Sequence, residues 1–338
     1  MNYAAAVENI WRHSECTFSN EAALMKEMVR YGTLAPSGHN TQCWKFQIHD
    51  RSITILPDLF RRTPVVDPDD HHLYTSLGCA VENLAQAAKA FGFMAHGKFC
   101  PESDGSIEVT LEPSKTEESP LFKAIPYRQC TRTDFDGLPL SSQELQLLEL
   151  AGTGNGVAVI LLTEQEAMEK VLEYVVQGNT MQIKNPAFVS ELESWIRFGD
   201  GEAIRTGDGL PSRVTGNPPA PRLLGRLLFR ASFRAKPEND KCARHIRSSA
   251  GIAVFVSEVD DKPHWVEVGR CYERFALQAT ALGVRNAFVN QPVEETGLRP
   301  EFAETFGIGD GRPDLVVRFG RGKEMPHSLR RPVEAVVT

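Results

Sequence analysis

The sequence has no Cys-x-x-Cys pair, no apolar run long enough to cross a bilayer and no excess of basic residues. Its seven cysteines are scattered and odd in number, which argues against a disulfide scaffold or a cysteine-rich zinc site. The longest apolar runs, such as Val157 to Leu162, are much shorter than the roughly 20 residues of a membrane helix. Lysine and arginine number 37 against 44 acidic residues, so the net charge is −7. We therefore expect no nucleic-acid partner.

The sequence also lacks the short motifs of several enzyme classes. No G-x-S-x-G or H-E-x-x-H pattern occurs. The glycine run 307–311 has no strand before it and no amphipathic helix after it, so it is not a nucleotide-binding loop. The first residues do not resemble a signal peptide. We expect a cytoplasmic protein with reduced cysteines and no membrane partner.

What is present is an ordinary globular composition of 338 residues, 41% hydrophobic and 24% charged. Strand-like and helix-like segments alternate, which predicts a mixed α/β or α+β fold. Asn20 and Ser141 are predicted helix N-caps, and Glu144 completes a capping box with Ser141. The predicted strands are 45–49, 52–56, 107–111, 157–162, 252–256 and 314–319, and the predicted helices are 20–32, 76–91, 141–150, 164–178, 186–198 and 266–282.

Two helical segments are similar to each other. Leu77–Phe93 and Val268–Val284 align without gaps and share a glycine near each end and a central glutamate. This predicts a degenerate duplication, with two halves forming an internal pseudo-dimer. A charged connector after Pro113 divides the chain into an N-terminal half, 1–113, and a C-terminal half, 120–338. The irregular stretch 199–245 is predicted to be a lid-like insertion; a disordered surface loop is the alternative.

Arginines at every fourth position within this insertion predict a basic amphipathic helix. Three interpretations are open: a solvated basic face over a packed apolar stripe, contact with an acidic cofactor or substrate, or association with a membrane surface. The arginines are Arg222, Arg226, Arg230 and Arg234.

A polar loop follows the first predicted long helix. In LAPSGHNTQCWKF, the residues Ser37, His39, Asn40 and Gln42 cluster before a strand. Amide groups donate and accept hydrogen bonds, which suits the edge of a planar heterocycle. The alternative is an ordinary loop whose side chains satisfy local backbone groups.

Two basic clusters occur in the second half. Arg128 and Arg132 stand four residues apart with Thr131 between them, and Arg330 and Arg331 follow the last predicted strand. Guanidinium and hydroxyl groups together hold a phosphate dianion well. Each arginine pair alone is also compatible with an ordinary exposed surface position. The segment VDPDDHH at 66–72 contains Asp and His, but its spacing indicates a turn before a helix, and we expect no metal site.

Three motifs together resemble the nitroreductase superfamily, and in particular its double-length, single-chain Acg branch. LAPSGHNTQCW is similar to the family's APS-x-x-N-x-QPW loop, and YRQCTRTDF to its arginine-containing opening. RFGRGKEMPHSLRRPVEAVV is similar to its C-terminal tail. The resemblance runs from about residue 20 to the end. Cys43 replaces the usual proline of the loop.

The resemblance implies one FMN per chain, at the seam between the halves. Its phosphate would be held by arginines of the second half, and its ring and ribityl regions by the loop of the first half. The implied cofactor-binding residues are Arg128, Arg132, Arg330, Arg331 and Thr131, together with Ser37, His39, Asn40 and Gln42.

The implied activity is an FMN-dependent oxidoreductase. NADH or NADPH would reduce the flavin, which would then reduce a quinone or nitroaromatic acceptor by a ping-pong scheme, with no catalytic side chain. One alternative is a protein that sequesters or stores FMN beneath a lid; another is a flavin oxidase or dehydrogenase of a biosynthetic intermediate. A monomer with its internal pseudo-dimer and a homodimer both fit.

Overall fold

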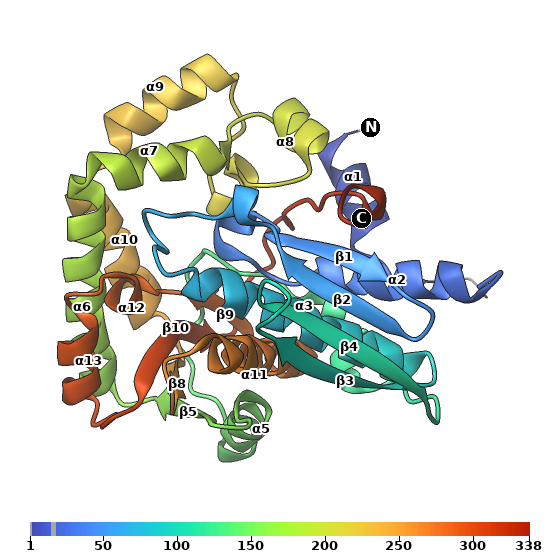
Figure 1. The fold of residues 1–338 in the computed structure, drawn as a ribbon. Helices are drawn as coiled ribbons and strands as arrows, with labels where there is room; N and C mark the ends of the chain where they lie inside the picture. The colour runs from blue at the N-terminus through green and yellow to red at the C-terminus, as the bar shows by residue number, and fades with distance from the viewer. Residues whose placement is uncertain (1, 15–17) are drawn as a thin grey trace.

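The computed structural model describes residues 2–14 and 18–338 and confirms a mixed helix and sheet fold (Figure 1). The first half forms one four-stranded antiparallel sheet, in the order β1-β2-β4-β3. A three-residue turn joins β1 to β2, and a long helix, α3, lies between β2 and β3 in the chain. The elements of this half are α1 (Tyr3–Ile10), α2 (Glu21–Thr33), β1 (Trp44–Ile48), β2 (Ser52–Pro57), α3 (His71–Ala90), β3 (Phe93–Cys100) and β4 (Ser106–Pro113).

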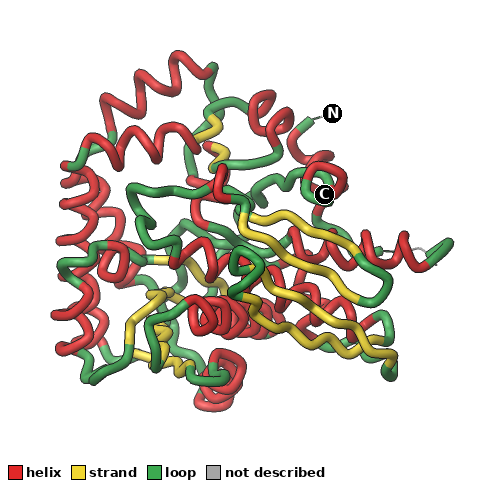
Figure 2. Tube along the Cα trace, in the orientation of Figure 1, coloured by secondary structure: helices red, strands yellow, loops and turns green. Residues whose placement is uncertain are grey.

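The second half repeats this topology. Its sheet is also antiparallel, in the order β5-β8-β10-β9, and a long helix, α11, again separates the second strand from the third. Figure 2 shows the two groups of strands with helices between them. The elements are α4 (Pro120–Ala124), α5 (Ser142–Gly152), β5 (Val157–Leu162), β8 (Gly251–Ser257), α11 (Lys262–Ala281), β9 (Arg285–Phe288), α12 (Gln291–Glu294), α13 (Arg299–Thr305) and β10 (Arg312–Gly320).

An insertion between β5 and β8 distinguishes the second half from the first. The predicted lid-like stretch 199–245 lies within it. Figure 1 shows its helices along one edge of the molecule, with α9 outermost beyond α7. The insertion comprises α6 (Gln165–Lys184), α7 (Pro186–Trp195), β6 (Ile196–Arg197), α8 (Asp200–Thr206), β7 (Leu210–Pro211), α9 (Arg222–Ser232) and α10 (Ala235–Arg247).

The two halves meet where α3 packs against α11. A Cβ atom on Gly78 would lie 1.9 Å from the carbonyl oxygen of Val266, and one on Gly269 would lie 1.9 Å from that of Thr75. These two contacts are equivalent under the sequence alignment of the two helices. Only glycine allows backbones to approach this closely, so the paired glycines bring the two helices together at the seam.

The C-terminal tail crosses from the second half to the first. The backbone N–H of Phe46 on β1 donates to the carbonyl of Val336 at 2.8 Å, and the N–H of Thr338 donates to Phe46 at 2.9 Å. The tail thus extends the first sheet. It also carries Arg330 across the seam.

Local sequence signals account for most element boundaries. The side chain of Asn20 caps α2, and the capping box of Ser141 and Glu144 forms as predicted. All six predicted strands are present. β3 was not predicted, because its edge position leaves all of its side chains partly or fully exposed and its pattern weak. β9 was not predicted, because four residues give too little periodicity.

The basic helix α9 forms, but its orientation differs from the first interpretation. Arg226 and Arg230 lie on the face toward α7 and form ion pairs with the buried Glu193, although their own side chains stay 40% and 63% exposed. The leucines instead face outward: Leu223 is 83% exposed and Leu227 is 66% exposed. The expected packed apolar stripe is therefore wrong, because buried glutamate attracts the basic face toward the protein.

No helix among the described residues combines the length and apolar character needed to span a membrane.

Candidate functional site

A cavity of about 230 Å³ lies at the seam. The loop beginning at Pro36 and one face of α3 form its first-half walls. The segment 128–132 and the tail residues 326–330 form the second-half walls, and Leu210 and Val214 of the insertion cover part of it. Six of the predicted cofactor-binding residues line this cavity: Ser37, His39, Asn40, Arg128, Arg132 and Arg330.

The first-half loop has an unusual backbone. His39, Asn40 and Gln42 all have positive φ, between 49° and 55°, a region that side chains other than glycine rarely adopt. The Ser37 hydroxyl accepts a hydrogen bond from the backbone N–H of Gln42 at 2.8 Å. Such strain persists only where neighbouring contacts fix it, so this loop is held in one shape at the cavity wall.

The Asn40 side chain holds several segments together. Its amide nitrogen donates to the carbonyls of Gly209 and Leu329 at 2.9 and 3.1 Å. Its amide oxygen accepts from Arg330 at 2.9 Å. One buried side chain therefore connects the polar loop, the insertion and the C-terminal tail.

Arg128 and Arg330 are buried, and only one of them has an acidic partner. Arg128 pairs with Glu273 of α11 at 3.1 Å. Arg330 donates instead to the carbonyls of Leu34 and Ala35, both at 3.0 Å. Arg132 has no hydrogen bond or ion pair to any part of the chain that the structure describes. Of these three guanidinium groups, only that of Arg128 pairs with a carboxylate among the described residues.

The pKa shifts agree with this positive field. Burial raises the pKa of Glu273 to about 7, although Arg128 lowers it. Burial and then Arg128 and Arg330 lower the pKa of His327 to about 3. Burial, Arg132 and His72 lower the pKa of His39 to about 4. Around pH 7 His39 and His327 are neutral, so the arginines supply the positive charge that suits an anion.

Three predicted site residues do not line the cavity. Gln42 donates to the Gly207 carbonyl at 2.9 Å, and its side-chain oxygen accepts from the backbone of Arg331 at 2.8 Å. The Arg331 guanidinium donates to the carbonyl of Ala335 at 2.7 Å. The Thr131 hydroxyl donates to Gln129 at 3.3 Å. The structure places these residues behind the wall, where they contact backbone and side chains of the protein.

The sequence analysis also missed a polar stripe on α3. His72, Thr75, Ser76 and Cys79 line the cavity at the spacing of one helix face. Polar residues recurring in a helix that is otherwise buried are a readable signal, but it was obscured by the alanine-rich apolar pattern of the same helix. Glu273 was noticed only as a shared residue of the duplication.

The position equivalent to the cavity on the other side of the seam is filled. There Glu82 pairs with Arg274 at 3.1 Å and with Arg270 at 3.5 Å. The residues that align with these arginines are Cys79 and Asn83, which are shorter and uncharged. The duplication is therefore asymmetric: one pseudo-equivalent position is open and the other is closed by ion pairs.

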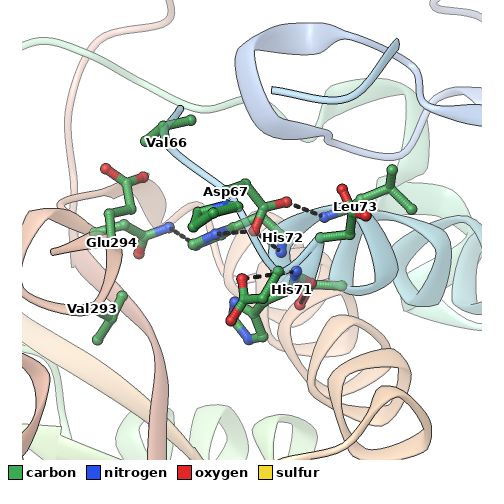
Figure 3. A network of polar contacts seen from close by, with 12 residues as sticks. Val66, Asp67, His71, His72, Leu73, Val293 and Glu294 are labelled. Atoms are coloured by element: carbon green, nitrogen blue, oxygen red, sulfur yellow. Dashed lines mark hydrogen bonds and ion pairs between the residues drawn. The ribbon is translucent and has the colours of Figure 1, made fainter. Parts of the chain in front are cut away.

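A second polar cluster adjoins the cavity (Figure 3). Asp67 accepts hydrogen bonds from the backbone N–H groups of His72 and Leu73, both at 2.9 Å, at the start of α3. His71 contacts Asp314 at 2.9 Å. The ligand atoms of Asp67, His71 and His72 lie within 4.8 Å of one another.

Comparison with known proteins adds a relationship along the whole chain. A Mycobacterium tuberculosis protein named "Putative NAD(P)H nitroreductase Rv3131" is 25% identical over 98% of this chain and 96% of its own length. A protein of a second strain, named "Putative NAD(P)H nitroreductase MT3217", matches equally. The resemblance to nitroreductases is confirmed. No protein-family model matches the chain.

Solved nitroreductase structures are more distant. The FMN-dependent nitroreductase NfnB of Mycobacterium smegmatis, in complex with NADPH, is 13% identical over 64% of this chain and 91% of its own, with a TM-score of 0.39. An FMN-bound nitroreductase of Bacteroides fragilis is 13% identical over 60% and 88%, with a TM-score of 0.37. Likeness at this level is too low to support a statement about function.

Proposed function

We propose that the protein is an FMN-dependent oxidoreductase of nitroreductase type, which passes electrons from NADH or NADPH to a quinone or nitroaromatic acceptor. The observation that supports it best is the excess of guanidinium groups at the seam cavity. Of the three arginines that line it, only Arg128 pairs with a carboxylate, that of Glu273, whose pKa burial raises to about 7. A phosphate monoester carries a charge between about −1.5 and −2 at pH 7, which matches that excess.

The residues present fit FMN. Arg128, Arg132 and Arg330 would hold its phosphate, and Ser37, His39 and Asn40 would line the region of its ring and ribityl chain. When bound, FMN would supply the redox chemistry of its isoalloxazine ring. We propose that Gln42, Thr131 and Arg331 act indirectly, by fixing the loop and the tail.

This chain's own residues prepare the site. Arg330 is fixed by backbone carbonyls before any ligand enters, so it would act on the phosphate mainly through its positive charge. Glu273 offsets the charge of Arg128. Leu210 and Val214 of the insertion add apolar side chains to the cavity wall, and a less polar surrounding strengthens electrostatic interactions.

The test is the absorption spectrum of the purified protein with and without added FMN, followed by NADH or NADPH under anaerobic conditions. We expect a flavin spectrum at one FMN per chain, bleaching by the donor and return of colour with a quinone. A protein that takes up no FMN would refute the proposal.

A second candidate, FMN retention without turnover, is favoured by the contacts of the insertion. Gly207 and Gly209 are hydrogen bonded to Gln42 and Asn40, and Asp208 forms ion pairs with Arg61 and Arg197. These contacts close the insertion onto the polar loop. A bound flavin that stays oxidised with both donors would identify retention as the function.

We propose a chain organised as halves 1–113 and 120–338, which would act as a monomer through its internal pseudo-dimer. Size-exclusion chromatography with light scattering distinguishes this from a homodimer.

A further inference from the structure

The cavity wall contains one carboxyl group that the proposed function has not used. Glu294 ends α12 and is the single acidic residue among the described residues that line the cavity. The other ionisable groups in the wall are arginines, histidines, cysteines and a tyrosine. Glu294 forms no ion pair with any arginine within the described ranges, so its role is not charge compensation of the phosphate region.

A hydrogen bond from the insertion holds this carboxyl in place, and the first half lies opposite it. Gln182 of α6 donates its side-chain N–H to Glu294 Oε2 at 2.8 Å. His72 of α3 lines the same cavity from the other half, and Figure 3 shows it near Glu294. The carboxyl therefore lies at the seam, between an element of the insertion and an element of the first half.

Asn290 and His72 line the cavity together with Glu294 and contact each other. Asn290 accepts a hydrogen bond from the backbone N–H of Val316 at 2.9 Å, which fixes its amide so that the NH₂ group faces His72 Nε2 at 3.3 Å. Burial lowers the pKa of His72, but the hydrogen bond and charge of Asp67 and the charge of Glu294 outweigh it, so the net direction is upward. His72 Nδ1 faces Asp67 at 3.5 Å.

The charged groups facing Glu294 have opposing effects. Burial raises its pKa most, and Asp67 also raises it, whereas His72 and the hydrogen bond from Gln182 lower it; the net direction is upward. The adjacent Glu295 also has a raised pKa, through burial and then through Glu294. A raised pKa is the property that a general acid requires near neutral pH.

We propose that Glu294 is the acid that protonates the electron acceptor in this cavity. The proposal rests on the proposed function. A quinone accepts two electrons and one proton, the equivalent of a hydride, which NAD(P)H supplies. The O–H bond of Glu294 breaks, its proton forms an O–H bond on the second quinone oxygen, and its electron pair stays on the carboxylate. Water then returns a proton to Glu294, and the products are hydroquinone and the oxidised donor.

The first test needs no cofactor and no turnover. Infrared spectra of the FMN-free protein, recorded above the ordinary glutamate pKa of 4.5, are compared between the wild type and Glu294→Gln. We expect the variant to lose a C=O stretching band of a protonated carboxylic acid. The matched control is Glu295→Gln, which alters the neighbouring residue outside the cavity wall and keeps this band. A difference spectrum without the band would overturn the proposal.

The second test separates the two half-reactions by stopped flow. We expect Glu294→Gln to slow acceptor reduction about 100-fold, the scale of general acid catalysis, and to leave FMN binding and reduction by NAD(P)H unchanged. Wild-type acceptor reduction should slow as the pH rises through the pKa of Glu294, because the acid is then deprotonated. The variant should lose this dependence.

A conservative variant distinguishes loss of the acid from a structural effect of the substitution. Glu294→Asp retains an acid and should recover part of the rate, whereas Glu295→Gln should behave as wild type. If Glu294→Gln reduced the acceptor at the wild-type rate, the assignment of Glu294 as the acid would be wrong, although the proposed function would stand. A protein that binds no FMN would instead refute the proposed function itself.

Discussion

Arg132 differs from the other cavity arginines because no carboxylate or carbonyl of the described residues holds it. We predict that Arg132→Ala weakens FMN binding by about 1.5–3 kcal/mol, the scale of a charge-assisted hydrogen bond, or roughly 10- to 150-fold. Its free energy of unfolding should change by less than about 0.5 kcal/mol. Flavin fluorescence titration and urea denaturation measure the two quantities.

The control for Arg132 is Arg247→Ala, which removes an exposed arginine that pairs with Glu169 far from the cavity wall. It should leave FMN affinity unchanged. Equal losses of affinity in both variants would indicate a general charge effect and would exclude Arg132 from the site.

His327 makes stability depend on pH. Its pKa is about 3 in the folded protein against 6.5 in the unfolded chain, so the unfolded state binds more protons between these values. The contribution of this residue is therefore complete above pH 6.5 and is lost as the pH falls toward 3, by up to about 1.4 kcal/mol per pH unit.

We predict that His327→Gln flattens the decline of the unfolding free energy between pH 6.5 and 4. Denaturant titrations at several pH values measure it. His49→Gln, which replaces an exposed loop histidine, should leave the slope as in wild type; an unchanged slope in His327→Gln would show that this histidine titrates normally.

At the residue scale, the sequence predicted side chains that stand in recognisable motifs. Arg128, Arg330 and Asn40 all reach the cavity wall. Glu273 and Glu294 could not be predicted, because their place at the seam depends on how α11 and α12 pack against the first half. A single carboxylate in an amphipathic helix has no local signature that distinguishes a cavity wall from solvent.

At the scale of elements, the α3–α11 contact depends on two glycines. We predict that Gly78→Ala and Gly269→Ala each lower the free energy of unfolding by more than about 3 kcal/mol, because a Cβ atom at either position would meet a backbone carbonyl at 1.9 Å. Both variants should also lose FMN binding, since the cavity is formed at this contact. Thermal melts and flavin titration measure these effects.

The control for the seam glycines is Gly201→Ala in α8, where a Cβ atom would meet nothing within 4 Å. Alanine there should leave stability unchanged or raise it by roughly 0.5–1 kcal/mol, because it restricts the unfolded chain. If Gly78→Ala melted like Gly201→Ala, the two helices would not be in close contact.

Element types were more predictable than element orientations. Hydrophobic periodicity and caps gave the long helices and most strands. The same periodicity in α9 suggested buried leucines, yet Glu193 attracts Arg226 and Arg230 inward and leaves Leu227 exposed. Periodicity shows that a helix has two faces; the charge of the neighbouring element, α7, decides which one packs.

At the scale of the whole molecule, the asymmetry of the duplication sets the number of sites. Arg270 and Arg274 occupy, with Glu82, the position equivalent to the open cavity. We predict that FMN binding saturates at one equivalent per chain in an equilibrium titration monitored by calorimetry. If two FMN molecules bound per chain with similar affinity, these ion pairs would have to break readily enough to admit the second one.

The duplication itself was visible in sequence because both helices keep glycines at the same places. Gly92 and Gly283 have positive φ and end their helices in the same way. The sheet order could not be predicted, because pairing between distant strands leaves no local trace. The insertion also concealed that β5 and β8 correspond to the adjacent strands β1 and β2.

The cavity walls come from both halves of one polypeptide. A site between two separate subunits disappears when dilution drives them apart. Here the connecting chain fixes the local concentration of one wall near the other. Ligand affinity at the seam should therefore not depend on the protein concentration. An inactivating substitution in one half should not be rescued by a second, intact copy of the chain.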